Sequence, residues 1–134
     1  MRFLASFLLL FAPGMAFGGD FAFICVYASA GGTTTLSCEV PAVNMSFTAV
    51  PAGMKAQVTG YTATTNNNNE FQGTLMAVDP AGDVRWSVPF RMGLSTALSA
   101  APDPGLPVQP GWDLVVQKVT GDAYVVIHGR LTAP

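Results

Sequence analysis

Residues 71–90, FQGTLMAVDPAGDVRWSVPF, decide the fold that the sequence predicts. Two runs of β-prone residues flank the turn-forming sequence DPAGD, a pattern that is typical of a β-hairpin. We expect its strands over 71–79 and 84–91. Alternation places four apolar side chains on one face of the second strand: Val84, Trp86, Val88 and Phe90. Pro89 has no backbone N–H group, so its strand is expected at a sheet edge or a bulge.

Similar short β-prone runs, separated by turn residues, occupy most of the rest of the chain, which is typical of a sandwich or a barrel. The further strands that we expect lie over 20–28, 35–40, 43–50, 54–65, 112–119 and 123–131. Residues 20–28 are apolar on both faces and therefore predict a buried strand. The run 35–40 is expected to return antiparallel to it. In the long run 54–65, Gly60 is a candidate bulge.

The last two runs flank the sequence TGDA and predict a further hairpin, in which Gly121 supplies the positive φ of the turn. Residues 92–101, MGLSTALSAA, are ambiguous. We favour a short helix there, because Leu94, Ala97, Leu98 and Ala101 have helical spacing. The proline-rich connector 102–111 is expected to have no regular structure.

These elements predict one all-β domain over residues 19–134. The expected fold is a small antiparallel meander of about eight strands, closed or nearly closed as a β-barrel, with a β-sandwich as the alternative. A length of 134 residues suits one domain. Half of the residues are hydrophobic and 10% are charged, so the chain can bury a core. A net charge of −2 leaves no basic stripe, and we expect no nucleic-acid partner.

Residues 1–18 have the layout of a secretory signal peptide. Arg2 precedes an apolar run over 3–12, and small residues permit cleavage after Ala16 or Gly18. The apolar run is shorter than the about 20 residues that a membrane-spanning helix needs. We therefore expect an exported protein, periplasmic or extracellular, that is not an integral membrane protein.

Cys25 and Cys38 are the only cysteines of the chain. An exported protein meets an oxidising compartment, and the spacing of the pair differs from that of a CxxC redox motif. We expect a structural disulfide between them. Closing a loop of this length should stabilise the fold by about 3 kcal/mol.

No recognisable catalytic motif is present in the sequence. The only histidine is His128, and alternation along 123–131 places it on the more polar face, so we expect a surface residue. Asp79 and Asp83 flank the predicted turn, and ordinary turn chemistry explains them better than a calcium site. We expect no metal and no cofactor.

Two functions of different classes fit these observations. The first is an exported noncatalytic binding or accessory protein that meets a protein partner through loops such as 66–70 and 102–111. The alternative is a β-barrel that holds a small apolar ligand. Its ligand-binding residues would be Phe47, Phe71, Met76, Trp86, Phe90 and Trp112. A small secreted hydrolase comes third, because nothing in the sequence specifies a catalytic set.

Overall fold

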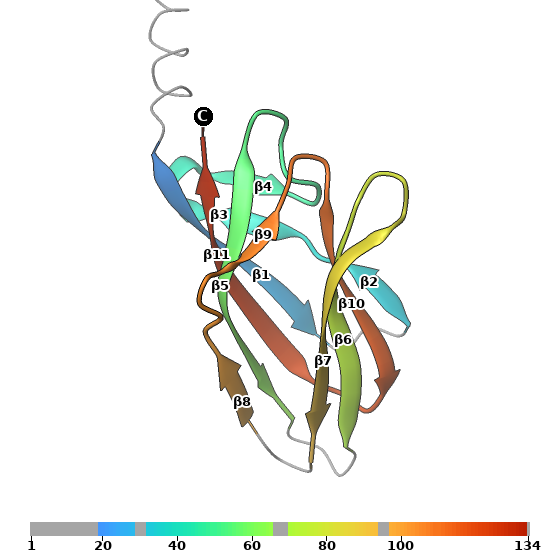
Figure 1. Cartoon of the computed structure of the whole chain (residues 1–134). Coiled ribbons are helices and arrows are strands. Elements are labelled where there is room, and N and C mark those ends of the chain that lie inside the picture. Colours follow the sequence, from blue (N-terminus) through green and yellow to red (C-terminus); the bar gives the residue numbers. More distant parts are fainter. Residues whose placement is uncertain (1–18, 29–31, 66–69, 94–96, 134) are drawn as a thin grey trace, which may run out of the picture.

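The computed structural model describes residues 19–28, 32–65, 70–93 and 97–133, so the predicted signal peptide lies outside the described residues. These residues form an all-β fold of antiparallel strands arranged in two sheets (Figure 1). Within them, no helix has the length and hydrophobicity needed to cross a bilayer.

The larger sheet, sheet A, has the strand order β4–β3–β1–β11–β5–β8, and β9 also pairs with β5. Its strands are β1 (Asp20–Ala28), β3 (Cys38–Val40), β4 (Met45–Phe47), β5 (Lys55–Thr64), β8 (Ala97–Ala100), β9 (Leu106–Val108) and β11 (Tyr124–Thr132). The short 3₁₀ helix η1 (Pro41–Val43) joins β3 to β4. Strands β8 and β9 lie one after the other along the same edge of β5.

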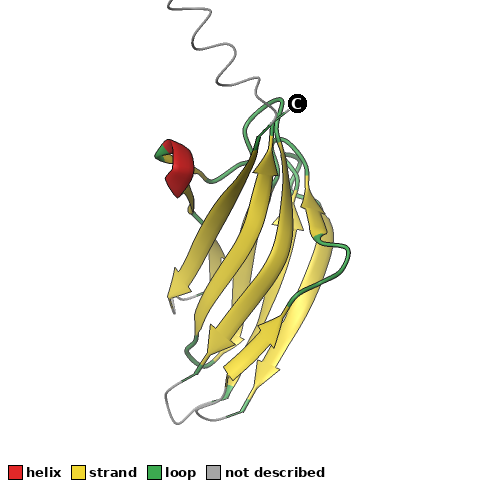
Figure 2. Cartoon of the chain, turned by 90° about the vertical axis from the view of Figure 1, so that its left-hand side faces the viewer, coloured by secondary structure: helices red, strands yellow, loops and turns green. Residues whose placement is uncertain are grey.

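The smaller sheet, sheet B, has the order β2–β10–β6–β7. Its strands are β2 (Thr33–Thr35), β6 (Phe71–Val78), β7 (Val84–Met92) and β10 (Asp113–Thr120). The strands are divided between two sheets, and within the described residues they do not close into the barrel that we expected. The arrangement fits the sandwich alternative, and Figure 2 views it from the side of sheet A.

The core lies between the two sheets. Aromatic contacts cross from one to the other: the ring of Tyr61 on β5 is 5.1 Å from that of Phe90 on β7, and Tyr27 on β1 is 6.4 Å from Phe71 on β6. Alternate residues of the long strands β1, β5, β6 and β11 supply much of the rest of the core, since side chains of a strand alternate between its faces. Packing between facing sheets therefore buries one side of each sheet and leaves the other open.

The predicted hairpin over 71–90 is confirmed as β6 and β7, and Pro89 lies on an edge strand as expected. The prediction that Val84 lies on the same face as Trp86 was wrong. Trp86 pairs with Ala77 but Val84 pairs with Val78, so Arg85 is an extra residue in a bulge. The bulge turns Val84 away from the face of Trp86, and Val84 is 53% exposed. The bulge expected at Gly60 is confirmed, with a register shift beside it.

The predicted hairpin between 112–119 and 123–131 is wrong. Strand β10 lies in sheet B and β11 lies in sheet A, so the turn between them carries the chain from one sheet to the other. The apolar faces of both strands are buried by this crossing, because each faces the opposite sheet. The positive φ of Gly121 is confirmed at 82°. A Cβ at Gly121 would collide with the backbone of Glu70 and Phe71.

The helix favoured over 92–101 is not found in its described part. Residues 94–96 lie outside the described residues, and Ala97–Ala100 form strand β8 against β5. The connector 102–111 was also mispredicted in part, because Leu106–Val108 form β9. Both segments pair with backbone groups along one edge of β5 that would otherwise lack partners. Local sequence does not reveal that edge.

Candidate functional site

Three connections lie close together at one end of the sandwich, the upper end in Figure 1. They are the β4–β5 connection (48–54), the β6–β7 turn (79–83) and the β9–β10 connection (109–112). We call these three segments, with Arg85 beside them, the loop end. Loops held on a rigid sheet scaffold are common binding surfaces.

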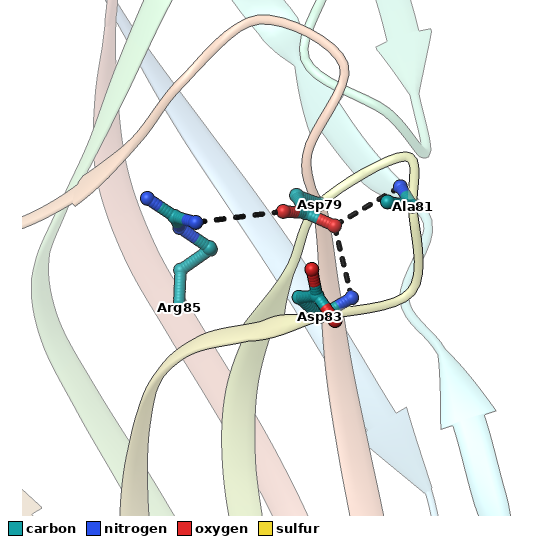
Figure 3. Close-up of polar contacts among 4 residues, drawn as sticks. All are labelled: Asp79, Ala81, Asp83 and Arg85. Atoms are coloured by element: carbon teal, nitrogen blue, oxygen red, sulfur yellow. Dashed lines mark hydrogen bonds and ion pairs between the residues drawn. The ribbon is translucent and has the colours of Figure 1, made fainter.

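The β6–β7 turn is held by Asp79 (Figure 3). One carboxylate oxygen of Asp79 accepts hydrogen bonds from the backbone N–H groups of Ala81 (3.0 Å) and Asp83 (2.9 Å). The N–H of Gly82 donates to the carbonyl oxygen of Asp79 at 2.9 Å, and Gly82 has a φ of 89°. The sequence DPAGD suits this geometry, because aspartate caps turn N–H groups, proline presets φ and glycine tolerates positive φ.

Arg85 joins the turn to the neighbouring β9–β10 connection. The bulge in β7 brings its guanidinium to 3.7 Å from the other carboxylate oxygen of Asp79 (Figure 3). The same guanidinium lies 5.3 Å from the ring centroid of Trp112. The Arg85 side chain is half-exposed, so the ion pair alone contributes little stability. Its main effect is to keep a cation and an indole ring together at the surface.

The β4–β5 and β9–β10 connections are joined by backbone hydrogen bonds. The N–H of Gly111 donates to the carbonyl oxygen of Val50 at 2.8 Å. The N–H of Val50 donates to the carbonyl oxygen of Trp112 at 3.0 Å. Val50 is buried, and Gly111 has a φ of 82°, which favours glycine there. The two connections therefore form one surface.

Trp86 ties the two sheets together below this surface. Its indole Nε1–H donates to the carbonyl oxygen of Pro107 at 2.7 Å, which links β7 of sheet B to β9 of sheet A. The hydrogen bond satisfies the polar atom of a half-buried indole.

The six residues predicted to bind an apolar ligand are divided between the core and the outer surface. Phe47, Phe71 and Phe90 are buried in the core, and Trp86 and Trp112 pack against it. Met76 lies on the outer face of sheet B, because its neighbours Leu75 and Ala77 are the buried residues of β6. Their ligand-binding role stays a prediction.

Two hollows in the described part of the molecule are lined by other residues. One of about 410 Å³ is formed by β3, η1 and β4, and is lined by Glu39, Val40, Pro41, Asn44, Met45 and Ser46. Another of about 260 Å³ lies over β5 and β9, and is lined by Lys55, Ala56, Gln57, Pro107, Gln109 and Thr132. Both are open depressions of the surface.

The cysteines and the histidine lie where we expected them. Cys25 and Cys38 are directly paired in the register of β1 and β3, and their sulfur atoms are bonded at 1.99 Å. Both are buried. His128 is exposed on the outer face of sheet A, with Ile24 and Gly60 as its cross-strand neighbours. Over the described ranges, no group of three or more His, Cys, Asp and Glu residues is placed to hold a metal ion.

The loops that we predicted for recognition contribute unequally. Residues 66–69 lie outside the described residues, and Glu70 directly precedes β6, which begins at the end opposite the loop end. Only the last part of 102–111 reaches the loop end. Sequence reasoning missed the β4–β5 connection, although the turn-forming residues PAG at 51–53 signal a turn.

No known protein family is matched by the sequence, and no curated protein matches it. Solved structures resemble the fold. A structure of Bacillus endospore appendages, described as disulfide-linked pili, has a TM-score of 0.50 at 9% identity, covering 86% of each chain. The globular domain of zebrafish complement 1qA protein has a TM-score of 0.43 at 14% identity, covering 81% of this chain and 94% of that one. At such identities the first likeness shows the fold alone.

Proposed function

We propose that this chain is an exported, noncatalytic binding protein that recognises a protein partner through the loop end. The observation that carries the proposal is the set of hydrogen bonds and ionic contacts that hold the three connections together without a partner. A surface that is ordered before binding loses less conformational entropy when a partner docks. The buried disulfide supports export, because disulfides persist in oxidising compartments, and we place the protein in the periplasm or outside the cell.

The edges of the two sheets are poor alternatives for recognition. The edge strands β2, β4, β8 and β9 are only three or four residues long. The longer edge strand β7 has Pro89 in its interior. Short strands and edge prolines are devices that prevent the addition of a foreign strand. Recognition through loops or through a sheet face is therefore favoured over strand addition.

The exposed residues of the loop end suit contact with a protein. Small side chains such as Ala52, Pro80 and Ala81 are exposed and allow a partner backbone to approach closely. Arg85, stacked on the half-buried Trp112, supplies a pair of residue types that are common in binding hot spots. We find no observation that favours the apolar-ligand alternative, and we do not propose it.

Site-specific photo-crosslinking in the native compartment tests this proposal. A photoreactive residue at Ala81 should capture a discrete protein partner, whereas one at Ser87, exposed on the outer face of sheet B, should not. Capture from Ser87 but not from Ala81 would place the binding surface elsewhere and refute the proposal.

With the captured partner in hand, affinity measurements should separate two arginines of the same strand. Arg85→Ala should weaken binding at least about tenfold, as expected for a hot-spot residue. The matched control Arg91→Ala removes an exposed charge from β7 outside the loop end and should leave affinity within about twofold. Equal losses in both variants would mean that general charge, and not the loop end, attracts the partner.

A further inference from the structure

Strand β1 is apolar on both faces, but the sandwich covers only one of them. Its inward residues Phe23, Cys25 and Tyr27 are buried. Its outward residues are also apolar: Ala22, Ile24, Val26 and Ala28. Val26 is 42% exposed, so the prediction that 20–28 is a buried strand is right for its inward face and wrong for its outward face. Strands that are apolar on both faces are typical of sheets covered on both sides.

Strand β11 extends this apolar surface. In the register of the two strands Val126 pairs with Val26, and the half-exposed Tyr124 pairs with Ala28. We call the outward side chains of β1 over 22–28 and of β11 over 124–130 the outer A face. Figure 2 looks onto the side of the molecule that carries sheet A. The apolar part of this face consists of the outward residues of β1 with Tyr124 and Val126, and the exposed His128 and Arg130 border it on β11. Such an apolar patch on the central strands of an open sheet is a mark of an interaction surface.

We propose that the outer A face binds the same face of a second copy of this chain. A two-fold axis parallel to the strands, midway between β1 and β11, places β1 of one copy over β11 of the other. Each residue of β1 in one copy then faces, across the interface, the β11 residue of the other copy that is its register partner within a single chain. Tyr124 meets Ala28, Arg130 meets Ala22, and Val126 meets Val26. Large side chains oppose small ones at both ends, which is the self-complementarity that a two-fold interface requires.

The charges around the face are compatible with this packing. Glu39 of β3 and His128 of β11 are both paired with Ile24 in the register, so they lie at the same level along the strands. The two-fold axis places β3 of one copy over β5 of the other, so Glu39 faces Gly60, the cross-strand neighbour of His128, and not another carboxylate. Arg130 is already paired with Asp20 of its own chain at 3.4 Å. No unpaired like charges are therefore forced together.

The area of the outer A face determines how strongly we expect the two copies to associate. The outer A face, seven residues on each of two strands, spans about 23 Å along the strands and about 10 Å across them, or about 230 Å² per copy. Stable interfaces bury at least about 1,200 Å² in total. The dimer should therefore be weak, and measurable at high protein concentration.

Sedimentation equilibrium of the purified mature chain, at concentrations up to about 1 mM, tests the proposal. The wild-type chain should show a monomer–dimer equilibrium. Val26→Lys should weaken the dimer at least about tenfold, while Val84→Lys should leave it unchanged. Val84 is a similarly exposed valine on the other sheet, which makes it a matched control. A wild-type chain that stays monomeric, or equal effects of both variants, would overturn the proposal.

A charge exchange tests the predicted register and protects against a folding defect in one variant. Val26→Lys and Val126→Glu should each impair self-association, but a mixture of the two should associate again, because lysine and glutamate then face each other. Failure of the mixture to associate, with both variants folded by circular dichroism, would refute the pairing of β1 with β11. These measurements use the chain alone, so they are independent of the partner proposed for the loop end.

Discussion

At Gly129 the inner face of β11 has no room for a side chain. The ring of Phe23 and the carbonyl oxygen of Gln57 occupy the position that a Cβ would take. Gly129→Ala should therefore destabilise the fold by about 1–3 kcal/mol, the usual cost of overpacking. Gly60 is the control, because a Cβ there would meet only the Ala100 carbonyl oxygen at 3.4 Å. If urea unfolding shows equal effects of Gly129→Ala and Gly60→Ala, our description of the central strands is wrong.

Asp79 is the residue on which the β6–β7 turn depends. Asp79→Ala removes the acceptor of two backbone N–H groups and the ionic partner of Arg85, and should cost about 1–2 kcal/mol in unfolding free energy. Asp83→Ala should cost less than about 0.5 kcal/mol, because the turn uses only the backbone groups of Asp83. Thermal unfolding of both variants checks the difference, and a larger effect at Asp83 would contradict it.

Tyr27 should make the free energy of unfolding fall at alkaline pH. Burial, and secondarily the charge of Asp122, raise the pKa of the Tyr27 hydroxyl above its ordinary value of 10.0. The unfolded chain therefore loses this proton first, and stability should be full below about pH 10 and fall as the pH rises above it. Tyr27→Phe should reduce that fall in urea unfolding measured from about pH 9 to 11.5. An unchanged slope in the variant would show that Tyr27 is not the responsible group.

At the scale of single residues, alternation predicts which side of a strand a residue occupies, because it depends only on neighbours in the chain. It correctly placed His128 on the outer face of β11. It failed at Val84, where the bulge at Arg85 reverses the alternation. The place of a bulge depends on how the partner strand aligns, and the strand's own sequence does not contain that information.

Among the elements, β1 and β3 are joined by the disulfide between Cys25 and Cys38. Replacing both cysteines with alanine should lower the unfolding free energy by about 3 kcal/mol, since the bond closes a short loop in the unfolded chain. Alkylation of the unreduced wild-type protein, unfolded in denaturant, should label neither cysteine. Two free thiols per chain would contradict the structure.

The hydrogen bond from Trp86 on β7 to Pro107 on β9 can be tested by removing its donor. Trp86→Phe keeps an aromatic ring but removes the Nε1–H that donates to Pro107. The loss should be about 1 kcal/mol, the usual net contribution of a hydrogen bond. Chemical shifts of Leu106–Val108 should move while those of β2 stay unchanged. No change at β9 would show that the indole does not hold it.

Element predictions succeeded where a local turn signal decides the pairing. The sequence DPAGD closes β6 on β7 because Asp79 accepts hydrogen bonds from the backbone N–H groups of Ala81, Gly82 and Asp83. The sequence TGDA carries a similar signal around Gly121, yet its strands enter different sheets. A tight turn and a crossing between sheets both use a glycine with positive φ, so the sequence alone does not separate them.

At the scale of the whole molecule, the same alternating strands fit a barrel and a sandwich equally well, because both bury every second residue. Long-range contacts such as Tyr61 with Phe90 determine the division into two sheets. The loop end was only partly predictable for the same reason. Its turn sequences are visible at 51–53 and 79–83, but the topology alone brings them to one end.

Our central claim is that the loop end is an ordered surface before any partner binds. Amide hydrogen exchange of the free protein, followed residue by residue by NMR, tests it most directly. The N–H groups of Val50, Gly111 and Asp83 should exchange on the order of 100-fold or more slower than in an unstructured chain, because each is hydrogen-bonded within the loop end. Exchange of these three groups at the rates of an unstructured peptide would contradict the claim.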